Sequence, residues 1–412
     1  MKTGSRYDAS ESDATLTALI FASVLSGSVL IPSVRPFFAT VAPGHEGGMH
    51  AFMALNMLGA IVGAPFLAAF ADRSGARKPL AVALTLADAA LLLAMARGPR
   101  LSILLSVRLV QGAANVGALS LLLGGIRGRR QQRHGRAFGA AAAAMIAAVA
   151  AGGPAGTLLL TAGPRAPLFA AAMIQLLVCG VLATRVELSA APTPGAGFAA
   201  LARMVPAVRG PALWVAIERF AVGTFVVTFS LYAHRELGLG DRHVGALMSC
   251  FLVPFALASY PMGRLGDRLD RGALLFMGMA TYGVCFVLLG FVRPAGLPVI
   301  LILTGVASAA IYSPSLCLAA ALPPEALRAT SMALVNVTGS LGMMAGTVIA
   351  GALSAALRSA GWGGRAYTAV FVAAGCLQIA CVLFSWSDLA RLGNADALNL
   401  GAIAAAREEA SR

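Results

Sequence analysis

Charged residues are scarce in this 412-residue chain, where aspartate, glutamate, lysine and arginine together make up 12% of the sequence. A soluble globular domain carries about 25%, because its surface must face water. Hydrophobic residues make up 58% of the chain, and apolar runs of about twenty residues, the length that crosses a hydrocarbon core as a helix, recur along it. The shortage of charge therefore excludes a soluble protein and indicates an integral membrane protein.

Cysteine and histidine are also few, with six and five copies. The cysteines lie in or beside apolar runs without CxxC or CxxH spacing, and the histidines do not cluster, so we expect neither a disulfide framework nor a metal site. No phosphate-binding loop of the Gly-x4-Gly-Lys-Ser/Thr type is present, so we expect no ATP hydrolysis and no cofactor. The net charge of +14 lies in short clusters between apolar runs, which argues against a nucleic-acid partner.

Apolar runs and their breakers predict an all-α integral membrane fold with twelve transmembrane helices. Backbone groups in lipid must be hydrogen-bonded within their own segment, so each run is expected to be helical. The expected spans are 15–34, 48–71, 79–96, 101–126, 137–162, 166–184, 211–233, 244–263, 272–292, 296–322, 329–357 and 366–387.

These spans divide into two six-helix bundles, residues 15–184 and 211–387, with tails at 1–14 and 388–412. The connection 185–210 contains Pro192 and Pro194 and then apolar residues at helical spacing. It predicts a flexible linker followed by a short helix lying on the membrane surface.

Lysine and arginine gather on one side of the expected spans, for example in the basic run from Arg127 to Arg136. Because cytoplasmic loops carry this excess, the pattern predicts that both termini are cytoplasmic in a multi-pass protein of the inner (plasma) membrane. The N-terminus lacks a basic region and a cleavage site, so we expect the first apolar run to stay as a helix.

The turns after the second and the eighth expected spans carry the same pattern. The two copies are Ala68-Ala69-Phe70-Ala71-Asp72-Arg73-Ser74-Gly75-Ala76-Arg77-Lys78 and Gly263-Arg264-Leu265-Gly266-Asp267-Arg268-Leu269-Asp270-Arg271. Two shorter echoes keep nearly the same offset, close to half the chain: Arg136-Ala137 with Arg328-Ala329, and Ala155-Gly156-Thr157 with Ala345-Gly346-Thr347. A duplicated six-helix unit, giving pseudo-symmetric bundles, explains all of these pairs.

The paired turns resemble the loop signature of the major facilitator superfamily, Gly-x-Leu-x-Asp-Arg-x-Gly-Arg-Arg/Lys. Ala68 replaces the leading glycine of the first copy, and Asp270 replaces the second glycine of the other. The fourth span is similar to the family's Arg-x-x-Gln-Gly motif, with Arg108-Leu109-Val110-Gln111-Gly112. The fifth resembles part of the Gly-Pro motif of proton-driven exporters, with Gly153-Pro154-Ala155-Gly156 between Val149 and Thr157, which replace flanking glycines.

This resemblance implies a gate at the cytoplasmic ends of the helices. A carboxylate can accept hydrogen bonds from the free N–H groups at a helix N-terminus and complement its dipole. By resemblance, Asp72 does this with the start of span eleven and braces an outward-open state. The alternative is a basic turn that only sets topology. The expected gating residues are Asp72, Arg73, Gly75, Arg77, Lys78, Gly263, Asp267, Arg268 and Arg271.

Ionisable residues inside spans are costly and point to a transport pathway. Asp88 lies near mid-membrane, about 15 Å past Lys78 at 1.5 Å per residue, and either binds a proton or a cationic substrate or serves as a structural partner. Arg108, in the motif with Gln111 and Gly112, is that partner, a helix anchor or, by resemblance, a residue that perturbs a carboxylate during proton movement.

Glu218 is a weaker candidate for proton coupling or substrate binding. It lies beside Arg219 in span seven, and neighbouring side chains diverge by about 100° around a helix, so we expect that the two do not line one path. Arg219 is expected to extend to the lipid headgroups.

Buried amides are interpreted as links between helices (Asn56, Asn115, Gln175, Asn336, Gln378). Gly153, Pro154 and Gly156 are expected to allow bending or close packing.

Together these features favour a secondary transporter that moves a small organic solute by alternating access and is not an enzyme. The partial motif of span five favours proton-coupled efflux, and proton-coupled uptake is the alternative. A non-transporting sensor or scaffold is a further alternative. A membrane-embedded enzyme would need a cluster of His, Asp or Cys at one membrane face, which the sequence does not show. The expected partners are the solute, protons and the lipid bilayer, and we expect a monomer.

Overall fold

The computed structural model describes residues 4–42, 46–126, 135–188, 198–324 and 327–392. Within these ranges the chain forms helices and contains no strand. The α-helices are Gly4–Ser28 (α1), Val34–Val41 (α2), Glu46–Ser74 (α3), Arg77–Ala96 (α4), Leu101–Gly125 (α5), Gly135–Leu159 (α6), Ala166–Arg185 (α7), Phe198–Arg235 (α8), Asp241–Leu265 (α9), Arg271–Leu289 (α10), Leu297–Ala321 (α11), Arg328–Ser359 (α12) and Arg365–Phe384 (α13), with short 3-10 turns at Ile31–Ser33 (η1), Leu160–Ala162 (η2) and Pro294–Gly296 (η3).

Twelve helical segments in the described ranges are long and apolar enough to cross a membrane. The first combines α1, η1 and α2, and each helix from α3 to α13 supplies one more. The prediction of an all-α membrane fold with twelve spans is thereby confirmed. Residues 1–3 and 393–412 of the expected tails, 189–197 of the expected linker, and the arginines at 127–134 lie outside the described residues.

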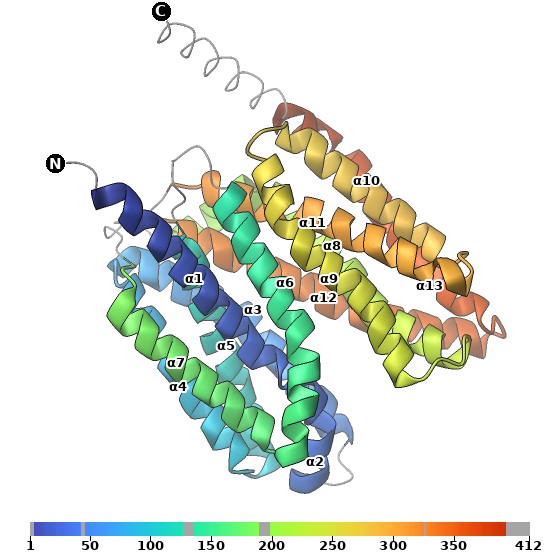
Figure 1. Ribbon diagram of the computed structural model, residues 1–412, viewed down its shortest axis with the longest axis horizontal. Coiled ribbons are helices and arrows are strands. Elements are labelled where there is room, and N and C mark those ends of the chain that lie inside the picture. The colour runs from blue at the N-terminus through green and yellow to red at the C-terminus, as the bar shows by residue number, and fades with distance from the viewer. Residues whose placement is uncertain (1–3, 43–45, 127–134, 189–197, 325–326, 393–412) are drawn as a thin grey trace, which may run out of the picture.

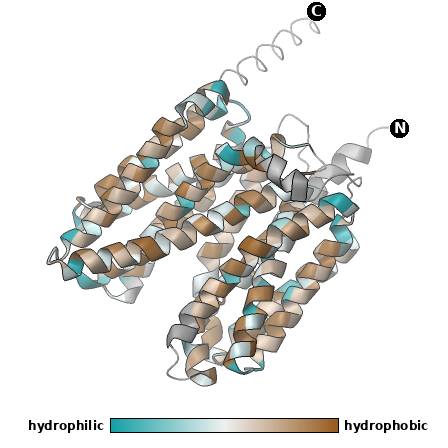
Figure 2. Cartoon of the chain, turned by 180° about the vertical axis from the view of Figure 1, so that it is seen from behind, coloured by the Kyte–Doolittle hydropathy of each residue, from teal (hydrophilic) through white to brown (hydrophobic). Residues whose placement is uncertain are grey.

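The helices form two bundles (Figure 1). Helices α1 to α7 make up one bundle and α8 to α13 the other. The bundles meet at the end where α6 and α12 begin, and their ribbons diverge toward the opposite end (Figures 1 and 2). The contacts that set the relative position of the two bundles are therefore concentrated at one end of the molecule.

Hydrophobic residues run along the outer helices, whereas hydrophilic residues gather at helix ends (Figure 2). Large apolar side chains lie on this surface, among them Leu158, Leu257 and Leu383. A water-soluble protein rarely exposes an apolar surface of this extent. In a bilayer, the same surface faces lipid tails.

Glycines allow helices of one bundle to pack backbone against backbone. A Cβ built on Gly346 of α12 would lie 2.0 Å from the carbonyl oxygen of Phe220 on α8, and one on Gly112 of α5 would lie 1.9 Å from that of Asn56 on α3. Small residues at helix contacts are the usual means of close packing in membranes, where apolar burial gives little driving force.

Helix α6 contains the residues expected to allow bending. It remains helical through Pro154 to Leu159. A Cβ on Gly156 would lie 2.2 Å from the carbonyl oxygen of Val29, so this glycine packs α6 against the end of α1, whereas one on Gly153 would meet nothing within 4 Å. Bending at Gly153, Pro154 and Gly156 stays a prediction.

The segment before the seventh span differs from the expected short surface helix. Helix α8 is continuous from Phe198 through Pro206 and Pro211. Trp214 Nε1 donates a hydrogen bond to Ser385 Oγ (2.9 Å) just after α13, and Val208 is buried. Of the apolar residues at helical spacing, Val208 packs on the bundle and begins the membrane span, whereas Val205 is exposed. The two prolines do not divide the helix.

We predict that Gly346→Ala lowers the melting temperature of the purified protein by several degrees. The added methyl group would force α12 away from α8, and overpacking of this kind costs about 1–3 kcal/mol. Gly351→Ala on the same helix is the matched control, because its Cβ would meet nothing within 4 Å. Thermal unfolding in detergent measures both variants, and equal melting temperatures would contradict the packing argument.

Candidate functional site

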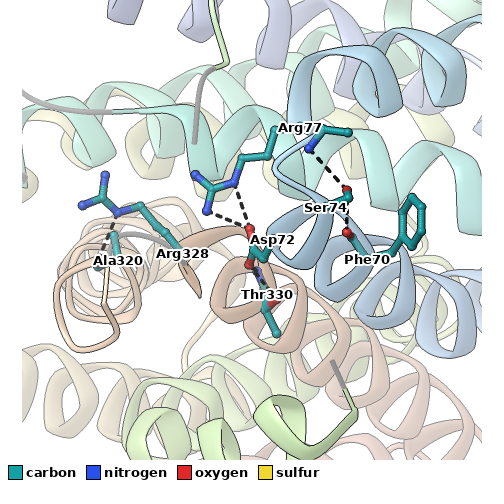
Figure 3. A network of polar contacts seen from close by, with 8 residues as sticks. Phe70, Asp72, Ser74, Arg77, Ala320, Arg328 and Thr330 are labelled. Carbon is teal, nitrogen blue, oxygen red and sulfur yellow. Dashed lines mark hydrogen bonds and ion pairs between the residues drawn. The ribbon is translucent and has the colours of Figure 1, made fainter. Parts of the chain in front are cut away.

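A buried carboxylate joins the two bundles where they meet. Asp72, at the end of α3, is fully buried. Its Oδ2 accepts hydrogen bonds from the backbone N–H (2.9 Å) and the hydroxyl (2.7 Å) of Thr330, in the first turn of α12. This is the contact with span eleven that the family resemblance implies (Figure 3). A carboxylate here satisfies the free N–H groups of the helix start and complements its dipole.

Arg77 neutralises the same carboxylate from within the first bundle. Its Nε and Nη2 lie 2.9 and 2.7 Å from Asp72 Oδ1, and its side chain is buried (Figure 3). The chain reverses between α3 and α4 at Gly75, whose φ of +69° favours glycine. The turn thus places Arg77 beside Asp72. We name Asp72, Arg77 and Thr330 the first clamp.

The second copy of the motif makes the corresponding contact in the other direction. Asp267, after α9, accepts hydrogen bonds from the backbone N–H groups of Gly135 (2.9 Å) and Arg136 (3.0 Å), where α6 begins. Arg271 Nη2 lies 3.8 Å from the same carboxylate. A Cβ on Gly263 would lie 2.2 Å from the carbonyl oxygen of Gly135, so α9 and α6 touch here. We name Asp267, Arg271 and the start of α6 the second clamp.

One departure from the family pattern has a local explanation. Asp270, which replaces a glycine, caps the N-terminus of α10 and accepts hydrogen bonds from the N–H groups of Gly272 (2.7 Å) and Ala273 (3.2 Å). Its φ is −59°, so this turn does not need the left-handed conformation that Gly75 adopts. The cap replaces the glycine turn in starting the next helix.

The other predicted gating residues lie at the surface. Arg73 and Arg268 occupy equivalent positions in the two copies, and both side chains are exposed. Lys78 forms an ion pair with Glu187 (2.9 Å), which is 81% exposed. Exposed pairs of this kind contribute little to stability. These three residues lie near the clamps without bonding to either clamp carboxylate in the described residues.

Arg328 makes contacts between the bundles that the sequence interpretation missed. Arg328, which begins α12, donates from Nη1 to the carbonyl oxygen of Ile126 (3.2 Å) and from Nε to that of Ala320 (3.3 Å), so it joins the ends of α5 and α11. Asn336 on α12, which was interpreted as a link between helices, donates to Ser120 Oγ on α5 (3.3 Å). The echo of Arg136 and Arg328 in the two halves was the available signal.

Asp88 is held inside the first bundle by three neutral amides. Its Oδ1 accepts from Gln111 Nε2 (2.7 Å), and its Oδ2 accepts from Asn115 Nδ2 (2.6 Å) and Gln175 Nε2 (2.7 Å). Gln175 also donates to Ser26 Oγ (2.8 Å). Asn115 and Gln175, interpreted as links between helices, thus belong to the surroundings of Asp88. We name Asp88 and its three amide donors the Asp88 cluster.

Arg108 reaches Asp88 only through Gln111. Its Nη1 donates to Gln111 Oε1 (2.7 Å), which also accepts from Asn56 Nδ2 (2.8 Å). The guanidinium lies over the Phe52 ring, 4.5 Å from its centroid, and Arg108 Nε has no hydrogen-bond partner among the described residues. The arginine and the carboxylate are therefore connected without direct contact, and Gly112 supports this geometry by packing α5 on α3.

Glu218 and Arg219 differ from expectation. Although adjacent in sequence, they form an ion pair, with Arg219 Nε 3.2 Å from Glu218 Oε2. Ser308 on α11 donates a hydrogen bond to Glu218 Oε1. The expected extension of Arg219 to the headgroups is wrong, because its guanidinium lies over the ring of Tyr312, 4.2 Å from the centroid. A flexible side chain can turn back toward its neighbour, which the angle between Cβ directions does not reveal.

The described residues contain no group of three or more His, Cys, Asp or Glu side chains that could hold a metal ion. None of the six cysteines, all of which lie in the described ranges, forms a disulfide.

A family model described as Major Facilitator Superfamily matches residues 16–233 and 212–395. The chain belongs to the major facilitator superfamily. Secondary transport and the two-bundle fold follow from this membership. No curated protein matches the chain.

Solved structures share the superfamily fold over nearly the whole chain. The human organic anion transporter MFSD10 (TETRAN) is 17% identical, with a TM-score of 0.72, covering 91% of this chain and 99% of that one. A bacterial homologue of the iron transporter ferroportin, in an outward-facing state, is 13% identical, with a TM-score of 0.73 and coverages of 91% and 99%. A variant of the Escherichia coli fucose:proton symporter FucP is 12% identical, with a TM-score of 0.69 and coverages of 90% and 98%.

We predict that Thr330→Val destabilises the protein by about 1.5–3 kcal/mol, the contribution of a hydrogen bond to a charged group. The substitution keeps the side-chain volume but removes the hydroxyl that donates to Asp72. Thr330→Ser, which keeps the hydroxyl, is the control and loses only a methyl group, worth about 0.8 kcal/mol. Chemical or thermal unfolding compares them. A valine variant as stable as the serine variant would contradict this contribution of the first clamp.

Proposed function

We propose that this protein is a proton-coupled secondary active transporter of a small organic solute, acting as a monomer in the inner membrane with both termini in the cytoplasm. The observation that carries the proposal is the pair of clamps. Each places a carboxylate of one bundle on the helix start of the other, at Thr330 and at Gly135. Two related, breakable contacts at one end are what alternating access requires of a duplicated fold.

The clamps supply a physical reason for two states. When the bundles touch, Asp72 and Asp267 satisfy helix N-termini that have no other acceptor from their own helix. When the bundles separate, water replaces these contacts, so the cost of opening is modest. With the orientation that the basic loops favour, the clamped end is cytoplasmic and the diverging end faces outward.

The Asp88 cluster supports proton coupling. The hydrogen-bond donors to Asp88 are neutral amides, and Gln111 separates the carboxylate from the cation Arg108. A carboxylate in a membrane interior without a direct counter-ion is stabilised when it takes up a proton. Asn115 lies on α5 and Gln175 on α7. A change in the charge of Asp88 therefore alters the hydrogen bonds that join helices of the first bundle.

Export is the direction that the Gly153-Pro154-Ala155-Gly156 segment favours, by its likeness to proton-driven exporters. The similar structures carry different cargoes in their names, an organic anion, iron and fucose. At these identities the likeness concerns the fold, and the cargo of this chain must be argued from its own residues.

We predict that Asp72→Asn combined with Asp267→Asn shifts the protein toward a state open at the clamped end. The amides lose charge and present N–H groups to helix starts that are also donors. Spin labels on a cysteine-free background report this through two distances, Arg185→Cys to Ala390→Cys at the clamped end and Arg97→Cys to Arg293→Cys at the other. The first distance should lengthen and the second should shorten.

The control for this experiment is Asp270→Asn. Asp270 lies in the same turn as the second clamp, but it caps α10 of its own bundle, and asparagine caps a helix equally well. Unchanged distances in the double variant would contradict the gating role of the clamps.

We predict that Asp88→Asn loses proton-driven flux in proteoliposomes. The variant keeps an acceptor oxygen but cannot carry a proton. A panel of radiolabelled and fluorescent compounds, tested with an imposed pH gradient, first identifies a transported solute, whose flux should then fall to background in the variant. Glu187→Gln removes an exposed carboxylate and serves as the control. Absence of flux for the entire panel, or wild-type flux in Asp88→Asn, would contradict the proposal.

A further inference from the structure

The ion pair on α8 has one buried and one partly exposed member. Glu218 is fully buried, whereas the Arg219 side chain is 16% exposed. Oε1 of Glu218 accepts a hydrogen bond from Ser308, whereas Oε2 forms an ion pair with Arg219 but has no hydrogen-bond partner among the described residues. A ligand that approaches this pair therefore meets the cation first.

Arg219 lies on the side of the second bundle that faces the first. Its guanidinium is 4.2 Å from the ring centroid of Tyr312 on α11 and 5.6 Å from that of Phe255 on α9. The Tyr312 hydroxyl in turn donates to the sulfur of Met145 on α6, in the first bundle (3.7 Å). The exposed part of Arg219 thus belongs to the region between the bundles, where an alternating-access transporter holds its solute.

The Arg219 guanidinium has more hydrogen-bond donors than its partners among the described residues use. It carries five N–H groups, and Glu218, whose Oε2 lies 3.2 Å from Nε, is its only anionic partner among the described residues. The Tyr312 hydroxyl is a hydrogen-bond partner of the guanidinium, and the Tyr282 hydroxyl interacts with it electrostatically. Aromatic rings on its flanks fix the plane of the guanidinium without using its N–H groups.

Buried polar atoms without partners lie in the same bundle. The Tyr282 hydroxyl, within electrostatic range of Glu218 and Arg219, has no hydrogen-bond partner among the described residues, and neither amide atom of Gln378 has one. Both side chains are fully buried. Few buried polar groups in a native protein lack a partner, and those that do call for a bound water, ion or ligand.

We propose that Arg219 anchors a carboxylate of the transported solute, and that Glu218 is the internal counter-ion of Arg219 when the site is empty. A guanidinium pairs with a carboxylate through two parallel N–H···O bonds, which gives strength and orientation. Phe255 and Tyr312, which are buried against Arg219 in the empty site, are the apolar neighbours of the bound carboxylate. The solute class is therefore a small organic anion with an apolar body, an inference that rests on the proposed transport function.

A cationic solute fits this site less well. It would need Glu218, whose side chain is buried and whose charge is already compensated by Arg219. It would also meet the positive guanidinium on its way in. An anion instead replaces Glu218 as the partner of Arg219 and uses donors that the protein leaves free.

The test measures binding to the full-length protein in detergent with matched compounds. The panel contains aromatic and aliphatic carboxylates, each with its neutral amide and its amine counterpart, and titrations followed by thermal stability give dissociation constants. We expect carboxylates to bind wild type and to lose about tenfold or more in affinity in Arg219→Gln, since a charge-assisted hydrogen bond corresponds to at least that factor. Arg209→Gln, an exposed arginine of the same helix, should bind as wild type does.

A second variant separates binding from folding. Glu218→Gln removes the carboxylate that competes for Arg219, so carboxylates should bind it several-fold more tightly than wild type. A structural ion pair would give the opposite result, because loss of either partner would only damage the site. The proposal is overturned if no carboxylate binds, if the compounds that bind are neutral or cationic, or if Arg219→Gln retains wild-type affinity.

The outcome is distinguishable from failure of the proposed function. Neutral or cationic solutes that are driven by a pH gradient in proteoliposomes would leave transport intact and refute the anion site. Carboxylates that bind through Arg219 but are not moved by any gradient would support the site and refute proton-coupled transport.

Discussion

The pairing of a buried carboxylate with the start of a helix from the other bundle is the interaction on which this structure depends. Asp72 without Thr330 would be an under-solvated charge, and α12 without Asp72 would begin with unbonded N–H groups. The carboxylate and the helix start satisfy each other's hydrogen-bonding groups only while the bundles are in contact. The contact is thus strong enough to define a state, and it can still be exchanged for water when the bundles separate.

Duplication gives the molecule two such contacts, and they are not equivalent. In the first clamp Arg77 is buried and lies 2.7 Å from its carboxylate, whereas in the second clamp Arg271 lies 3.8 Å away. The second clamp also relies on direct contact between Gly263 and the start of α6. The first clamp is therefore the more electrostatic and the second the more steric. Opening of this end must disrupt both kinds of contact.

Much of the fold was predictable because its signals are local. Apolar runs of sufficient length identified the twelve spans, and the repeated turn located both clamp carboxylates. The errors arose where structure depends on what a helix packs against. Hydropathy could not show that Pro206 and Pro211 lie within one helix, or that Asn115 and Gln175 point at Asp88. The pair of Glu218 and Arg219 was misjudged because side-chain flexibility, and not Cβ direction alone, decided the contact.

The two bundles contain their buried ionisable side chains in different arrangements. In the first bundle, the Asp88 carboxylate is surrounded by amides, and Arg108 is connected to it through Gln111. In the second, the carboxylate is hidden, and the arginine is the accessible partner. A membrane interior tolerates neither charge alone, so each bundle reaches near-neutrality by a different route. Arg219, the accessible cation of the second bundle, suits an anionic ligand. Asp88, a carboxylate with only neutral donors in the first bundle, suits a proton. The sequence repeat therefore preserved the helices and the clamps, while the interiors of the two halves diverged.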